Sequence, residues 1–171
     1  GVWTVPLAAW ALSVMKAGGM AVIPNPAKID FPARLTPTHS LSLWGYTKMN
    51  DPRWTWGEKY FFLRQDSAAE KPQKIGCMNT SGWAAYLRNG NAFVKQFDCF
   101  TDASYPDFNC NFETFTDASM LEMETLSPLV HLEPGKKIEH LETWSLHTNV
   151  QTPASDADVD RFLLPLIKNQ S

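Results

Sequence analysis

The sequence predicts an all-β protein, an antiparallel β-sandwich that ends in one short helix. Three observations lead to this fold class. Short alternating or aromatic-rich segments recur between turn signals, an Asn-Gly pair divides one of these segments, and helical character is confined to the C-terminal end. The 171 residues are enough to bury a sizeable core. We expect a single domain over residues 1–171, with the sandwich over 1–148 and a helical segment over 155–168.

The segments expected to form strands are separated by stretches rich in Pro, Gly and small polar residues. In chain order they are residues 3–15, 20–24, 40–47, 59–66, 74–79, 83–97, 110–116, 119–126 and 137–148. The Pro-rich stretch 23–37 and the polar stretch 64–73 are expected to be surface loops, because the strand pattern resumes after each of them.

Asn89-Gly90 is the clearest turn signal in the chain. Both central positions of a type I′ turn need a positive φ, which Asn and Gly adopt at low cost. The pair predicts a tight hairpin within residues 83–97. Its register pairs Leu87 with Ala92, Tyr86 with Phe93, and Ala85 with Val94.

The helical segment has a recognisable beginning. Ser155 is a candidate N-cap with Asp158 three residues on, and the apolar stretch VDRFLLPLIKN follows. Pro165 lacks the backbone donor that a helix interior needs, so it is expected to stop or kink the helix.

Composition and charge exclude several partners. Charged residues make up 19% of the chain and hydrophobic residues 44%, which favours a packed protein over a disordered one. The net charge of −3 comes without a run of Lys or Arg, so no nucleic acid partner is expected. The apolar run at residues 5–23 is interrupted by Lys16 and Gly18-Gly19, so no membrane span is expected. The chain opens at Gly1 without an initiator Met, and we expect a missing segment upstream.

No metal or other cofactor is expected. Cys77, Cys99 and Cys110 lack CxxC spacing and form no metal-ligand pattern with the histidines. Free thiols are favoured, with a Cys99–Cys110 disulfide as the alternative. Asp102 and Asp107 share a loop but lack the spacing of a calcium site.

Carboxylates interrupt the apolar character of residues 120–146. In a strand, Glu122 and Glu124 point to one face, whereas Leu121 and Met123 point to the other. A buried charge without a partner is costly, so these glutamates are either solvated on an outer face or have a functional role.

The second half of this stretch is expected to return beside the first. The turn signal Pro134-Gly135 predicts that residues 119–126 and 137–147 are adjacent strands. The returning strand then places His140 and Glu142 on one face with large apolar groups. Aromatic surface next to acid and imidazole groups is typical of a sugar-binding cleft.

The same stretch, MLEMETLSPLVHLEPGKKIEHLETWSL, resembles the closing hairpin of galactose mutarotase-like domains, in which the catalytic glutamate strand is followed by a Pro-Gly turn. NFETFTD resembles the strand before it. From Gly1 to about Leu146, the chain more closely resembles a bacterial family of that fold, the domain of unknown function DUF4380. The matching motifs are AAWALSVMKAGGMAVIPNP, SLSLWGYTKMNDPRWTWGEKYFFLRQD, KIGCMNTSGWAAYL and FVKQF. The resemblance implies a galactose mutarotase-like supersandwich that lacks its N-terminal strands.

The resemblance also implies carbohydrate chemistry. Mutarotases open and reclose an aldose ring with a glutamate base at the anomeric hydroxyl and a histidine acid at the ring oxygen. Glu124 matches the position of that glutamate, and Glu122 is the alternative two residues earlier. The segment that carries the acid histidine has no match in this chain. His140 is a further catalytic candidate, because the predicted hairpin places it beside Glu124.

Other residues are candidates for substrate binding. They are Glu113, Asn111, His39, Trp44, Lys74 and Lys95. Each lysine interrupts an apolar run, and a buried amine there would need an acidic partner such as Glu113 or Glu124. The alternative for all of them is structural: solvated or hydrogen-bonded polar groups, a core indole, and lysines that extend to solvent.

Two classes of function stay open. One is an enzyme, either aldose 1-epimerase-like or a glycoside hydrolase, that acts on a mono- or oligosaccharide; the other is a non-catalytic carbohydrate-binding module. Side chains two apart in a strand are about 6.6 Å apart at Cβ, which does not decide between retaining and inverting hydrolysis. A raised carboxylate pKa in an enclosed pocket favours the enzyme, and an open aromatic strip favours the module. The sheet edge left by the missing strands predicts a homo-oligomer.

Overall fold

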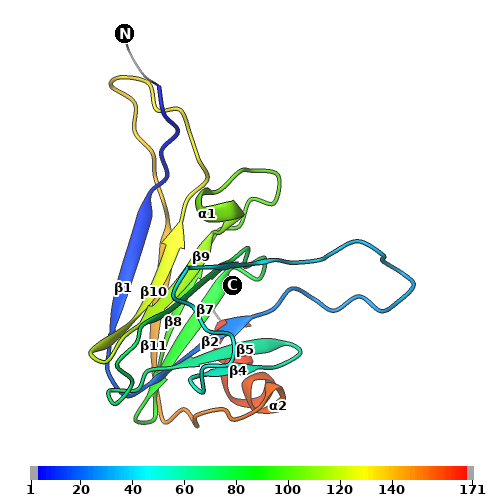
Figure 1. Ribbon diagram of the computed structural model, residues 1–171, viewed down its shortest axis with the longest axis vertical. Helices are drawn as coiled ribbons and strands as arrows, with labels where there is room; N and C mark the ends of the chain where they lie inside the picture. Colours follow the sequence, from blue (N-terminus) through cyan, green and yellow to red (C-terminus); the bar gives the residue numbers. More distant parts are fainter. Residues whose placement is uncertain (1–3, 169–171) are drawn as a thin grey trace.

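The computed structural model describes residues 4–168 and contains two antiparallel sheets (Figure 1). The five-stranded sheet has the order β1 (Trp10–Lys16), β10 (Met120–Leu126), β9 (Phe112–Thr116), β6 (Gln73–Cys77) and β3 (Leu41–Leu43). The six-stranded sheet has the order β11 (Glu142–Thr148), β8 (Asn91–Phe97), β7 (Trp83–Arg88), β2 (Met20–Pro24), β5 (Tyr60–Arg64) and β4 (Trp54–Trp56). This arrangement confirms the predicted all-β sandwich.

The core between the sheets follows from the alternation of side chains along the strands. Leu121 of the five-stranded sheet and Ile23 and Phe61 of the six-stranded sheet belong to one buried apolar cluster. Since neighbouring side chains point to opposite faces, Glu113 and Glu124 are placed on the outer face of the five-stranded sheet. Strand periodicity therefore decides which face of this sheet carries the two glutamates.

The C-terminal segment covers the other face of the six-stranded sheet. It comprises α2 (Asp156–Asp158), the π-helical turn η1 (Val159–Leu163) and α3 (Leu164–Lys168). Buried Val159 and Leu163 pack against that sheet. The Ser155 cap is confirmed, because its hydroxyl accepts a hydrogen bond from the Asp158 amide at 3.3 Å. Pro165 does not stop the helical segment, because it is the second residue of α3, which continues to Lys168, and the π turn precedes it.

The hairpin between β7 and β8 has the predicted register. Asn89 and Gly90 have φ values of 50° and 74°, as a type I′ turn requires. The three expected pairs are present: Leu87 with Ala92, Tyr86 with Phe93, and Ala85 with Val94.

The predicted pairing of residues 119–126 with 137–147 is wrong. β10 pairs with β1 and β9, whereas β11 lies in the other sheet and pairs with β8. Pro134-Gly135 does form a turn, with Gly135 at a φ of 78°, but this turn lies in a long connection between the two sheets. The connection pairs with the segment before β1 through Val130 and Leu7, so the turn does not bring β10 and β11 together.

Several boundaries differ from the expected ones. The first strand begins at Trp10, and residues 137–141 precede β11 without strand structure. β4 was not expected, and neither was α1 (Pro106–Asn109), a turn with left-handed residues.

Cys77, Cys99 and Cys110 are free thiols, which confirms the favoured alternative. Within residues 4–168, no helix has the length and apolar character needed to cross a membrane.

The homo-oligomer stays a prediction. β1 and β11 are each the end strand of a sheet, and Val14 and Leu146 on them are 59% and 80% exposed. Because such edges pair with further strands, we expect a mass above that of the monomer in light scattering. Leu146→Lys should lower this mass, since a charge on an edge strand opposes pairing. A monomeric mass at every concentration would contradict the prediction.

Candidate functional site

The candidate site is centred on Lys74, on the outer face of the five-stranded sheet. Its Nζ atom lies 2.8 Å from Oε2 of Glu113 and 2.8 Å from Oε2 of Glu124. The three residues come from the neighbouring strands β6, β9 and β10. Glu113 and Glu124 are 1% and 0% exposed, so the two carboxylates and the amine form a buried charged cluster.

Strand register explains why this cluster forms. Glu113 and Glu124 are direct cross-strand partners, an arrangement that is unfavourable for like charges unless a cation compensates. On the other side of Glu113, its partner is Gly76. A Cβ atom at Gly76 would lie 2.6 Å from Sγ of Cys110 and 3.2 Å from Cγ of Glu113. Gly76 therefore leaves the room that the Glu113 side chain occupies.

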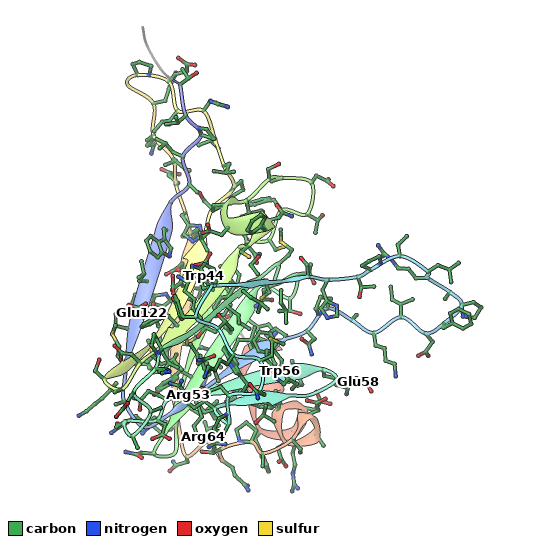
Figure 2. All side chains as sticks on the ribbon, in the orientation of Figure 1. Trp44, Arg53, Trp56, Glu58, Arg64 and Glu122 are labelled. Atoms are coloured by element: carbon green, nitrogen blue, oxygen red, sulfur yellow. The ribbon has the colours of Figure 1, made fainter. Side chains whose placement is uncertain are left out.

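Two indole rings flank the amine. Nζ of Lys74 lies 4.7 Å from the ring centroid of Trp44 and 5.3 Å from that of Trp10, within the range of cation–π attraction. The Trp10 indole also donates a hydrogen bond to Oε2 of Glu124 at 2.9 Å. Trp10 stays 55% exposed, so part of its ring is free to contact a ligand. Figure 2 shows Trp44 and Glu122 in the region of β1 and β10, with Trp56 and Glu58 beside β4 and β5.

A pocket of about 400 Å³ lies over this cluster. Its walls combine aromatic, apolar and charged groups, as sugar sites and other small-molecule sites do. The lining residues are Pro6, Leu7, Ala8, Trp10, Trp44, Lys74, Pro106, Asp107, Glu113, Leu126 and Leu129.

The Glu113 carboxyl group has a pKa raised to about 7. Burial is the largest cause, and interactions with Asp107 and Glu124 act in the same direction, against the opposing effect of Lys74. Burial alone would lower the pKa of Lys74, but its hydrogen bonds to Glu113 and Glu124 outweigh burial and raise it. The site therefore places the Lys74 amine, which stays protonated, next to the Glu113 carboxyl group, which titrates near neutral pH.

Each carboxylate keeps one oxygen without a hydrogen bond. Oε1 of Glu113 and Oε1 of Glu124 are buried and accept no hydrogen bond from the residues that the structure describes. Buried polar atoms are nearly always satisfied, and exceptions are found where strain, a catalytic role or a bound water or ion accounts for them. Of the two glutamates only Glu113 lines the pocket, and a hydroxyl group is a donor of the kind that its oxygen needs.

The raised pKa of Glu113 predicts how stability depends on pH. The folded chain keeps this proton up to about pH 7, whereas an ordinary glutamate loses it near 4.5. The free energy of unfolding should therefore fall as pH rises through this window, by up to about 1.4 kcal/mol per pH unit. Urea unfolding across the window should show a flatter profile for Glu113→Gln, and an unchanged slope in that variant would contradict the assignment.

Of the candidates named from sequence, Lys74, Glu113, Glu124 and Trp44 meet in this site. Glu122 shares their face of the sheet, where burial raises the pKa of its carboxyl group. Lys74 is not extended into solvent, and it has both acidic partners that the sequence suggested.

His140 and Lys95 belong to a different cluster, on the inner face of β10. Nε2 of His140 lies 2.8 Å from Oγ1 of Thr125, whose side chain points away from that of Glu124. The expectation that His140 lies beside Glu124 is therefore wrong. Lys95 is fully buried and lies 2.8 Å from Glu142, so its acidic partner is neither Glu113 nor Glu124.

Asn111 and His39 are not brought to the pocket walls. Asn111 is fully buried, and its side chain accepts a hydrogen bond from the Asn79 amide at 2.6 Å and donates to the Asn79 carbonyl at 3.1 Å. This is a structural role. His39 is exposed in the loop after β2, where its Nδ1 lies 3.0 Å from Oγ1 of Thr38.

Trp10 and Asp107 are site residues that sequence reasoning missed. The sequence pattern assigns Trp10 to a strand, and alternation along that strand places it on the same face as Leu12, the partner of Glu124. Asp107 was considered only as a calcium ligand, because its approach to Glu113 depends on an unusual turn. Among residues 4–168, no group of three or more His, Cys, Asp or Glu side chains is arranged to hold a metal ion.

Comparisons with models of known protein families, with curated proteins and with solved structures gave no match to this chain.

Proposed function

We propose that the chain binds a sugar in the pocket over Lys74 and interconverts its anomers, as an aldose 1-epimerase-like enzyme. The observation that supports this most directly is the Lys74 amine, held 2.8 Å from two buried carboxylates and flanked by two indole rings. Indole faces suit the C–H surface of a sugar ring, and charged groups orient its hydroxyls.

Glu113 is the proposed proton-transfer group. It lines the pocket, and its pKa of about 7 suits a group that must both take up and return a proton near neutral pH. Its carboxylate removes the proton of the anomeric hydroxyl, the bond between the anomeric carbon and the ring oxygen breaks, and the ring oxygen takes a proton from water. Rotation about the adjacent carbon–carbon bond and reversal of these steps give the other anomer.

Lys74 and Glu124 support that step. The ammonium group of Lys74 stabilises negative charge on the ring oxygen as the ring opens. Glu124 is fully buried and binds both Lys74 and the Trp10 indole, so its proposed role is to position them. This differs from the sequence-based hypothesis, in which Glu124 is the base, and the two assignments are separated by the variants discussed below.

Glycoside hydrolysis with retention is the second candidate. The Oε2 atoms of Glu113 and Glu124 both lie 2.8 Å from one nitrogen, so they are at most twice that distance apart. Retaining enzymes place their carboxyl groups about 5–5.5 Å apart, and inverting enzymes about 6.5–9.5 Å apart. The shared lysine therefore favours retention over inversion if the chain is a hydrolase.

Thermal unfolding with a panel of mono- and oligosaccharides tests the proposal. A bound sugar at 100 times its dissociation constant should stabilise the chain by about 2.7 kcal/mol. Any sugar that binds is then followed by NMR as a freshly dissolved pure anomer. Faster interconversion with the protein supports epimerisation, release of a reducing end supports hydrolysis, and binding without turnover supports the module. If no sugar stabilises the chain, the proposal fails.

A further inference from the structure

A second hollow adjoins the pocket over Lys74. It has a volume of about 190 Å³ and is lined by Ser42, Leu43, Trp44, Asp107 and Phe108. Trp44 and Asp107 line both hollows, so they form the boundary between the two. A ligand longer than one sugar ring would pass this boundary.

The turn that supplies Asp107 and Phe108 has an unusual backbone. Asp107, Phe108 and Asn109 all have left-handed conformations, with φ values of 50°, 61° and 75°. Asp and Asn adopt this region more readily than other residues with a side chain, but for a bulky residue such as Phe108 it is costly. Strain of this kind persists where the surroundings impose it, and it gathers at functional sites.

Specific contacts hold the turn in place. The Asp107 carbonyl accepts hydrogen bonds from Oγ of Ser42 at 2.9 Å and from Sγ of Cys110 at 3.0 Å. Oδ1 of Asn109 accepts one from the Tyr105 amide at 2.9 Å. The conformation is thus tied to β3 and to the start of β9, the elements that border the candidate site.

Phe108 gains no burial from this arrangement. It is 93% exposed, and it lines the second hollow together with Trp44. The exposed phenyl ring does not stabilise the fold through burial, because it removes almost no apolar surface from water. An exposed ring that lines the same hollow as a tryptophan does suit the apolar face of a second sugar.

We infer that the ligand of this site is an oligosaccharide of at least two rings. This inference rests on the proposed function. One ring lies over Lys74 between Trp10 and Trp44, and the next stacks on Phe108 in the second hollow. Asp107, at the boundary, accepts hydrogen bonds from hydroxyls on both rings. Phe108 therefore sets the preference for oligosaccharides over monosaccharides.

Calorimetry with matched sugars tests this inference. The probes are glucose with cellobiose and maltose, galactose with lactose and β-1,4-galactobiose, and mannose with β-1,4-mannobiose. At least one disaccharide should bind about tenfold or more tightly than its monosaccharide, a difference of about 1.4 kcal/mol. Phe108→Ala should abolish this ratio and leave the monosaccharide affinity unchanged, and Phe108→Trp should retain it.

Two further variants control for effects of backbone strain and of removing an exposed ring elsewhere. Phe108→Gly relieves the backbone strain and removes the ring, so it should lose the ratio as Phe108→Ala does. Phe31→Ala removes a ring that is 84% exposed in the loop after β2 and should change nothing. Equal affinity for mono- and disaccharides in the unchanged protein, or a ratio that survives Phe108→Ala and Phe108→Gly, overturns the inference alone. Absence of binding by every sugar overturns the proposed function with it.

Discussion

Glu113→Gln is expected to lower the turnover of a bound sugar by about 10²–10⁴, the usual contribution of a placed proton-transfer group. The amide keeps the shape of the side chain, and Lys74 keeps its contact with Glu124, so the dissociation constant should change only a few-fold. Comparing kcat with binding affinity checks this, because loss of a group that acts in the transition state lowers kcat without a matching loss of binding.

Glu124→Gln separates the two possible assignments. If Glu124 only positions Lys74 and Trp10, this variant should lose less turnover than Glu113→Gln and more binding. A full loss of turnover in Glu124→Gln with an active Glu113→Gln would instead support Glu124 as the base. Glu139→Gln is the matched control, since Glu139 is exposed and its partner Lys137 is exposed as well. It should leave both turnover and binding unchanged.

Lys74→Met is expected to lower the free energy of unfolding by about 3–5 kcal/mol above pH 7, the loss typical of breaking a buried ion pair. Met fills a similar volume but leaves Glu113 and Glu124 as buried neighbours without a cation. Below the pKa of Glu113 the loss should be smaller, because one carboxyl group is then neutral. Chemical denaturation on both sides of pH 7 measures the difference.

Two further variants show whether charge is the cause of that loss. Adding Glu113→Gln and Glu124→Gln to Lys74→Met should recover part of the stability, because no buried charge then remains in this cluster. Lys137→Met removes an exposed lysine from its pair with Glu139 and should change stability by less than about 1 kcal/mol. Equal losses in Lys74→Met and Lys137→Met would show that the charged cluster contributes nothing to the fold.

Local features of the fold were predictable from sequence because neighbouring residues decide them. Asn89-Gly90 fixes a two-residue turn, and with it the register of β7 and β8. Alternation along a strand assigns Glu124 and Leu121 to opposite faces before the strand has a partner. The Ser155 cap likewise depends on residues three apart.

Pairing over long distances was not predictable in the same way. The alternation of side chains along β10 is the same whether this strand pairs with β11 through a direct turn or with β1. The alternation alone therefore does not identify the partner of β10. The incorrect pairing carried His140 to the wrong face of β10. Burial of both sheets against one core decides the partner, and that depends on the whole chain.

In the candidate site, too, the local features were predictable from sequence and the long-range contacts were not. Sequence identified Lys74, Glu113 and Glu124 as residues of suitable chemistry and named both glutamates as partners for the lysine. Only the tertiary structure decided that one amine serves both carboxylates, because β6 is far in the chain from the consecutive strands β9 and β10 but lies beside β9 in the sheet. Asp107 reaches the site through a left-handed turn held by contacts with other segments, and the bulky Phe108 within that turn does not favour such a backbone. Residue chemistry and strand periodicity are local properties, whereas burial, ion pairing and strained backbone arise when distant segments pack together.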